Sequence, residues 1–153
     1  MGSIYQKMTG FFNDDGWPVF VLGDAQALQI NFQGTNGSWT CFAQARDETS
    51  QMVFYSVCPV TAPEAKRAQV AEYITRANYG LVVGNFEMDY DDGEVRYKTS
   101  IDVEGTELTT ELIRPLVYAN VWTMDRYLPG IMAVAFGGAA AGAALKMIEG
   151  NDA

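Results

Sequence analysis

The sequence predicts an α+β fold, in which helices pack on an antiparallel β-sheet of five to six strands in the order α-(β)-β-β-β-α-β-β-α. Asn36-Gly37 and Asp92-Gly93 each separate two runs of alternating apolar and polar residues, as the turn of a β-hairpin does. Other segments carry apolar residues at helical spacing. With 153 residues, 48% of them hydrophobic, we expect one domain over residues 1–153 with its own core.

The first segments are predicted as a short helix and a strand. Residues 3–13 place four large apolar residues at helical spacing, after Ser3 as the predicted N-cap. Residues 17–22 form a short apolar run. Because Pro18 cannot donate to a central ladder, we expect this run to be an edge strand or the start of a strand.

A meander of three strands is predicted next, over residues 26–34, 38–47 and 51–59. A two-residue turn at Asn36-Gly37 would place Phe32 opposite Cys41 and make one face of the meander apolar.

The two cysteines, Cys41 and Cys58, share that apolar face. A four-residue loop between their strands sets them directly opposite one another, whereas a two-residue loop makes them diagonal neighbours. They have no CxxC spacing, so we interpret them as small buried residues and not as a redox pair.

The other face of the predicted sheet is less polar than a solvated face should be. This second apolar patch is our candidate partner or dimer surface, with the residues Phe42, Val53, Tyr55, Val57, Leu81 and Val83. The sequence pattern allows two alternatives for what covers this patch. One is the chain's own N-terminal segment or C-terminal tail, and the other is a subunit or a partner protein.

Residues 61–79 give the clearest helix. Thr61 and Glu64 fit a capping box, and Gly80 follows the last helical residue. The predicted buried stripe of this helix is Val70, Tyr73, Ile74 and Ala77.

Residues 80–103 are predicted as one hairpin that orients the whole sheet. A two-residue turn at Asp92-Gly93 would place Tyr90 opposite Val95 and keep one face apolar. The same register pairs opposite charges across the strands on the other face, Asp89 with Arg96 and Glu87 with Lys98.

Helix returns over residues 107–127, with Pro115 expected to kink or restart it. A second piece is predicted from Pro129 towards Glu149, before a frayed tail at 150–153. The predicted core face of the first piece is Leu108, Leu112, Ile113, Leu116 and Ala119.

The stretch 128–145 has no charge in 18 residues, the length at which a membrane span is considered. It is rich in Ala and Gly and weakly hydrophobic, which favours a packed or dimer-forming helix over a span.

Composition excludes several kinds of chemistry. The net charge is −9 with no basic run, so neither nucleic acid nor an anionic membrane is an expected partner. The chain has no histidine, which excludes Ser-His-Asp and Cys-His catalysis. The acidic cluster DYDDGE lacks the twelve-residue layout of a calcium loop. We therefore predict no catalytic residue, no metal and no cofactor. We also see no secretory signal, and we expect a cytoplasmic location.

Four stretches resemble the bacterial YbjN family of sensory transduction regulators: FYSVCP, ANYGL, VGNFEMDYDDGEVRYKTSIDVEG and DRYLPGI. The resemblance covers residues 26–134, and the chain departs from the family after Phe136. It implies the fold of type III secretion chaperones, which are small acidic dimers. The shared motifs look structural, so we carry over no functional residue.

Our first hypothesis is a non-enzymatic protein-binding or regulatory module, chaperone-like and homodimeric, that holds another polypeptide. The alternative is a small-ligand binder or a carboxylate enzyme that uses a cleft between helix and sheet. Convergent acids in such a cleft would favour the alternative, and a filled apolar interface would count against it. A third hypothesis is membrane association through residues 128–145.

Overall fold

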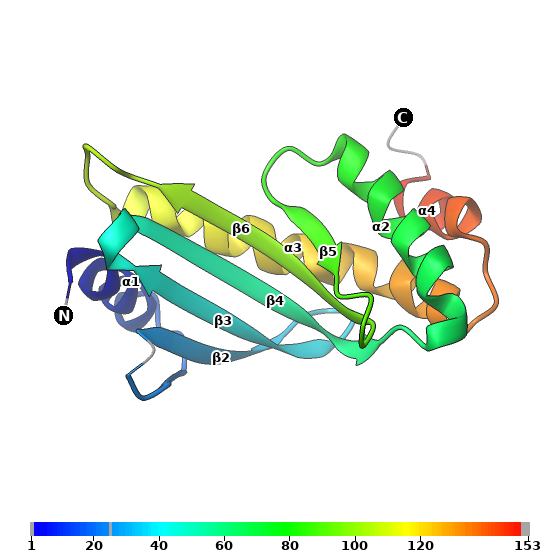
Figure 1. Ribbon diagram of the computed structural model, residues 1–153, viewed down its shortest axis with the longest axis horizontal. Helices are drawn as coiled ribbons and strands as arrows, with labels where there is room; N and C mark the ends of the chain where they lie inside the picture. The colour runs from blue at the N-terminus through cyan, green and yellow to red at the C-terminus, as the bar shows by residue number, and fades with distance from the viewer. Residues whose placement is uncertain (1, 25, 151–153) are drawn as a thin grey trace.

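The computed structural model describes residues 2–24 and 26–150, and the predicted end of the tail at 151–153 lies outside them. Within this part of the chain, six strands form one antiparallel sheet in the order β1-β2-β3-β4-β6-β5, which confirms the predicted α+β class (Figure 1). The strands are β1 (Val19–Val21), β2 (Ala27–Gln33), β3 (Ser38–Arg46), β4 (Gln51–Thr61), β5 (Asn85–Met88) and β6 (Glu94–Asp102). The helices are α1 (Ser3–Asp14), α2 (Arg67–Gly80), α3 (Thr110–Ala135) and α4 (Ala141–Glu149).

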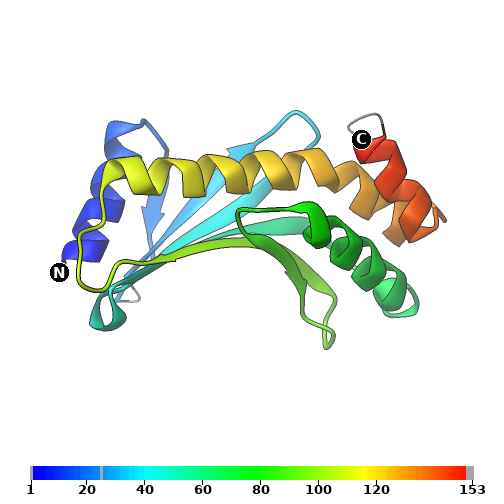
Figure 2. The same cartoon turned by 90° about the horizontal axis from the view of Figure 1, so that it is seen from above.

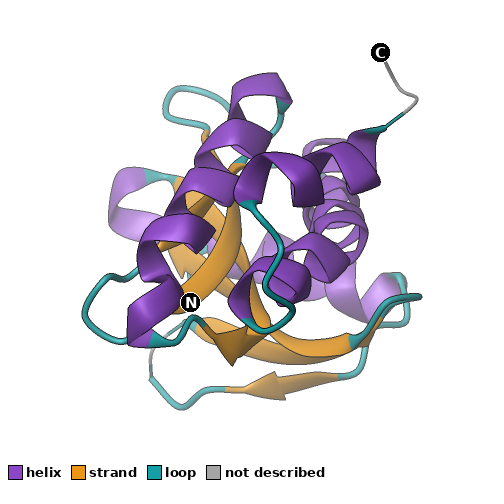
Figure 3. Cartoon of the chain, turned by 90° about the vertical axis from the view of Figure 1, so that its right-hand side faces the viewer, coloured by secondary structure: helices purple, strands orange, loops and turns teal. Residues whose placement is uncertain are grey.

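The helices cover one face of the sheet and leave the other bare. The long helix α3 runs along the sheet, with α1 at one end and α2 and α4 at the other (Figures 1 and 2). Figure 3 looks at the molecule from the end where α2 and α4 lie. The chain's own helices therefore do not cover the second apolar face, although the sequence left that possibility open.

The core lies between α3 and the covered face of the sheet. It contains Leu28, Ile30, Phe54 and Tyr97 from the strands. The residues that α3 buries include Ile113, Val117, Val121, Met124 and Ile131.

Of the predicted core residues Leu108, Leu112, Ile113, Leu116 and Ala119, the burial of Leu108 and Ile113 is confirmed, whereas Leu116 and Ala119 are only half-buried. Leu112 is 38% exposed, and Leu108 is buried but precedes the helix. The helix begins at Thr110, where the hydroxyl of Thr109 accepts the Leu112 N–H at 3.2 Å. The predicted helical spacing was counted from Leu108, which belongs to the preceding loop. It therefore selected residues of α3 that lie beside the buried stripe.

Neither proline ends α3, so the predicted start of a second helix at Pro129 was wrong, and the helix does not restart at Pro115. Pro129 lacks the N–H that would bind the Asp125 carbonyl. The side-chain amide of Asn36 donates to that carbonyl at 2.9 Å, which satisfies the acceptor and keeps the helix continuous. The break comes later, at residues 136–140. The uncharged stretch is thus divided between two helices, and none of the helices described here meets the length and hydropathy needed to span a membrane.

Both hairpins have a register two residues away from the predicted one. Ile30, not Phe32, lies opposite Cys41, and Met88, not Tyr90, lies opposite Val95. The strands leave four residues in the first loop, 34–37, and five in the second, 89–93, and the paired residues keep their predicted faces.

Local and distant carboxylates explain these longer loops. In the second loop, the Asp89 and Asp92 side chains accept the N–H groups of Asp91 and Glu94 at 2.9 and 2.8 Å. In the first loop, Asp125 of α3 accepts the N–H groups of Thr35 and Asn36 at 3.0 and 2.8 Å, which holds the loop against the helix.

The cysteines lie where the diagonal register puts them, because Cys41 is opposite Ser56. Both thiols are free and buried, and the Cys41 sulfur lies 3.5 Å from the Ser56 hydroxyl oxygen. Burial raises the pKa of both thiols to about 11, so they stay protonated at neutral pH. Their interpretation as small buried residues is confirmed.

The two shorter predicted helices form, but their predicted caps do not. The carboxylate of Asp47 accepts the N–H of Ile4 at 2.8 Å, in place of a cap by Ser3. Thr61 is the last residue of β4, so it cannot form the capping box, and a 3₁₀ turn at Glu64–Lys66 leads into α2. The predicted stripe of α2 is confirmed, with all four of its residues buried.

Candidate functional site

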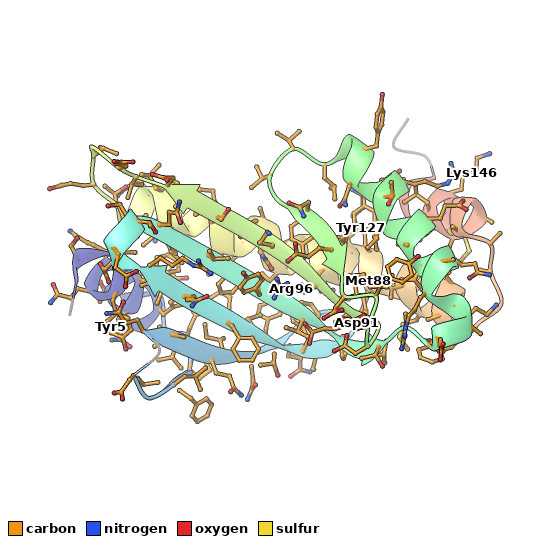
Figure 4. All side chains as sticks on the ribbon, in the orientation of Figure 1. Tyr5, Met88, Asp91, Arg96, Tyr127 and Lys146 are labelled. Atoms are coloured by element: carbon orange, nitrogen blue, oxygen red, sulfur yellow. The ribbon has the colours of Figure 1, made fainter. Side chains whose placement is uncertain are left out.

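The bare face of the sheet, which we call the open face, is the candidate site. Antiparallel pairing aligns Phe20, Gln29, Phe42, Tyr55 and Lys98 in one row across five strands. The next rows add Val57 beside Arg96 and Val53 beside Ser100. Figure 4 shows Arg96 on this face, over the middle of the sheet.

Four of the six predicted surface residues meet on the open face. Phe42, Tyr55 and Val57 are half-buried there, and Val53 is 9% exposed. All four belong to β3 and β4, whose alternation the sequence shows clearly.

Leu81 and Val83 do not join them, which corrects the prediction. They lie in the loop between α2 and β5, because β5 begins only at Asn85. Leu81 packs against the core, and Val83 is 44% exposed. Gly84 has a φ of +80°, and a Cβ on it would lie 2.5 Å from the Lys98 carbonyl oxygen, so glycine is required where the loop enters β5.

Sequence reasoning missed Phe20, which is 55% exposed and forms the end of the aromatic row. Its run, residues 17–22, is continuously apolar, and such a run does not show which residue faces which side. Only the pairing of Phe20 with Gln29 assigns it to the open face.

A cluster of charged side chains lies at the centre of the open face. The Arg96 guanidinium lies 4.1 Å from the centroid of the Tyr55 ring, a cation–π contact. Arg96 and Lys98 both form ion pairs with Glu87, at 2.5 and 3.1 Å. Partial burial alone would raise the pKa of Glu87, but the hydrogen bonds from Lys98 and Arg96 outweigh it, so the pKa is lowered. The predicted ion pair of Glu87 with Lys98 thus forms, while Arg96 lies opposite Glu87 instead of Asp89.

Two shallow hollows flank Tyr55. One, of about 290 Å³, includes Phe42, Val57 and Arg96 in its lining, and the other, of about 270 Å³, includes Val53 and Lys98. They are smaller than most sites for small-molecule ligands, and their size suits single side chains of a partner. In the described part of the chain, no group of three or more Cys, Asp or Glu residues could hold a metal.

A second apolar surface lies on the exposed side of α3, and we call it the α3 aromatic patch: Pro115, Tyr118 and Trp122. Trp122 is 64% exposed, and the patch borders a hollow of about 510 Å³. The carboxylate of Asp15 accepts a hydrogen bond from the Tyr118 hydroxyl at 2.6 Å, which fixes that ring. The molecule thus has two exposed apolar surfaces, the open face and the α3 aromatic patch.

Comparison with known proteins places this geometry in a family. Residues 6–132 match the YbjN family, described as "Putative bacterial sensory transduction regulator". No curated protein matches the chain.

Three solved structures are similar to the chain. YbjN from E. coli is 12% identical, with 88% of this chain and 90% of that one covered and a TM-score of 0.60. A chain of the ExsC–ExsE complex is 14% identical, with 84% and 95% covered and a TM-score of 0.60. The Yersinia pestis type III secretion chaperone SycH, in complex with a stable fragment of YscM2, is 10% identical, with 78% and 95% covered and a TM-score of 0.52. At these identities the likeness to the three structures shows the fold, whereas the match over residues 6–132 shows the family: the chain belongs to the YbjN family and has a fold like that of the type III secretion chaperones.

Proposed function

We propose that this protein is a non-enzymatic regulatory module of the cytoplasm that binds another polypeptide on its open face. The observation that carries the proposal is the aromatic row Phe20, Phe42 and Tyr55, which crosses the sheet without a covering helix. Two of the similar structures contain a second polypeptide, ExsE in one and a fragment of YscM2 in the other, which supports the proposal.

The chemistry of the open face indicates what such a partner presents. The hollows beside Tyr55 accept apolar side chains, and the surrounding Arg96, Lys98 and Glu87 form a polar rim. An extended segment with apolar residues at alternate positions would place them on one side, towards these hollows. The net charge of −9 favours a basic partner through long-range attraction.

Tyr55→Asp tests the binding surface. It puts a carboxylate between the hollows, so we expect it to abolish capture of the partner from extract of the source cells. Tyr79→Asp is the matched control, because Tyr79 is 96% exposed on α2, away from the open face. Circular dichroism would verify that both variants fold. Equal recovery of the same co-purifying polypeptide by both variants would contradict the proposal.

We also propose that the protein is a homodimer, and the two apolar surfaces give two ways to form it. Size-exclusion chromatography with light scattering at high micromolar protein concentration measures the oligomeric state. A clean monomer would contradict the proposed dimer. Comparing Tyr55→Asp with Trp122→Asp then identifies the surface, since only the variant at the dimer interface should lower the measured mass.

The alternative function, a small-ligand or enzymatic site between helix and sheet, finds no supporting observation among the described residues. The α3–sheet interface is filled by fully buried side chains such as Phe54, Met124 and Ile113. Among the described residues, the polar residues that are buried are Ser56, Thr99 and Asn120, none of which is a carboxylate.

A further inference from the structure

A cavity larger than the hollows of the open face lies away from that face, between α2, α3 and α4. Its volume is about 820 Å³, within the usual range for sites that bind small molecules. Leu81, Leu145 and the ring of Tyr127 give it an apolar lining. Figure 4 labels Tyr127 and Lys146, which lie at this end of the molecule.

Positive charge is concentrated around this cavity. Arg76, Arg126 and Lys146 line it, three of the ten Lys and Arg residues of a chain with net charge −9, and Glu149 is the acid beside them. Arg76 forms an ion pair with Glu72 at 2.8 Å but keeps its side chain 56% exposed. For the ammonium of Lys146, the described residues supply neither a hydrogen bond nor an ion pair.

The carboxylate of Glu149 is already engaged by a proton donor. The Tyr127 hydroxyl donates to it at 2.5 Å. Burial, together with this carboxylate, raises the pKa of Tyr127 to about 12, so the phenol keeps its proton at neutral pH. The acid is thus held against the tyrosine, and Lys146 is the cation of the cavity whose ammonium has no ion pair among the described residues.

Small residues keep the cavity open. Gly80, Gly142 and Ala143 form part of its wall. A Cβ added at Gly80 or Gly142 would meet nothing within 4 Å, so larger side chains at these positions would extend into free space. Neither glycine has a positive φ, so backbone conformation does not require glycine there.

We propose that this cavity binds a small amphiphilic anion. A phosphate or carboxylate head would contact Lys146 and Arg76, and an apolar body would pack against Leu81 and Leu145. The cluster of cations selects the charge of the head, and the lining selects the apolar body. This site is separate from the open face, and its occupation does not depend on the proposed polypeptide partner.

Octyl phosphate, below its micelle concentration, is the probe. We expect saturable binding by calorimetry, with amide shifts in ¹H–¹⁵N NMR spectra confined to α2, the end of α3, and α4. Lys146→Glu removes the unpaired ammonium and should weaken binding by about tenfold or more. Lys7→Glu makes the same charge change on an exposed residue of α1, at the other end of the molecule, and should leave binding unchanged.

Gly142→Leu separates loss of the cavity from loss of the fold. The new side chain would extend from the cavity wall into open space, while replacement of glycine within α4 favours the helix, so we expect an equal or higher melting temperature with weaker binding. Absence of octyl phosphate binding to the wild type would overturn the proposal. Equal binding of octyltrimethylammonium, or equal binding to Lys146→Glu, would overturn the charge selection. Equally tight binding of inorganic phosphate would overturn the proposal that the apolar body of the ligand contributes to binding.

Discussion

Phe54 and Tyr55 are neighbours on β4 but lie in different environments. Phe54 is 1% exposed and packs in the core under α3, whereas Tyr55 lies half-buried on the open face beneath Arg96. The same contrast holds along the sheet, where one face is sealed by helices and the other carries aromatic rings without a cover. We therefore expect the covered face to provide most of the stability of the fold, and changes on the open face to cost little stability.

The two faces also treat polar groups differently. On the covered side, the Asn120 amide donates to the carbonyls of Phe54 and Tyr97 and to the Thr99 hydroxyl, at 3.0, 3.1 and 3.2 Å. On the open side, polar groups form ion pairs that water can reach. Removing one hydrogen-bonding group should thus lower the free energy of unfolding strongly on the covered face. Removing one member of an ion pair on the open face should lower it only slightly.

The largest expected effect is at Phe54. Phe54→Ala should lower the free energy of unfolding by about 3–5 kcal/mol, because it leaves a cavity in the core. Urea unfolding followed by circular dichroism measures the change. A loss below about 1 kcal/mol would contradict the assignment of stability to the covered face.

Asn120→Ala should have the second-largest effect. It leaves two strand carbonyls and a hydroxyl on the covered face without their donor, which should cost about 1–3 kcal/mol. Asn31→Ala, an exposed position of β2, is the control and should change stability by less than about 0.5 kcal/mol. If urea midpoints shift equally for both, the contrast between the faces fails.

Tyr55→Ala should have a smaller effect on stability. It removes the contact of the ring with Arg96, worth about 0.5–1 kcal/mol, and some half-buried surface. Partner capture should nevertheless fall strongly. A loss of stability as large as that of Phe54→Ala would show that the open face also supports the core.

The smallest expected effect is at Glu87 and depends on pH. Folding lowers the pKa of Glu87, so its ionised form adds stability that is fully present above its ordinary pKa of 4.5. This stability is lost as the pH falls through the folded-state pKa. Glu87→Gln should cost about 0.2–1 kcal/mol at pH 7, with the difference shrinking in acid. If the difference in the free energy of unfolding between the wild type and Glu87→Gln grew in acid, the lowered pKa of Glu87 would be contradicted.

Much of the fold could be predicted because alternation and helical spacing report which side a residue faces. Phe42, Val53, Tyr55 and Val57 were placed on one face by alternation alone. The hairpin registers were not predictable in this way, because a shift of two residues leaves every side chain on the same face.

The missing information was tertiary or local in origin. The first loop is held by Asp125, a residue about ninety positions away along the chain, and no pattern near Asn36 indicates it. The helix was predicted to begin at residue 107, whereas α3 begins at Thr110, after the cap at Thr109. Phe20 was missed since its strand does not alternate, and Leu81 was misplaced since the strand was extended back to the end of α2.

The two buried thiols allow the transient separation of the helices from the sheet to be measured. Cys41 and Cys58 are its only cysteines, and both are protonated and inaccessible in the folded state. An alkylating reagent can therefore reach them only during transient exposure of the covered face. The rate of labelling, followed by mass spectrometry without any engineered site, would report how often the helices separate from the covered face, and whether a bound partner slows that event.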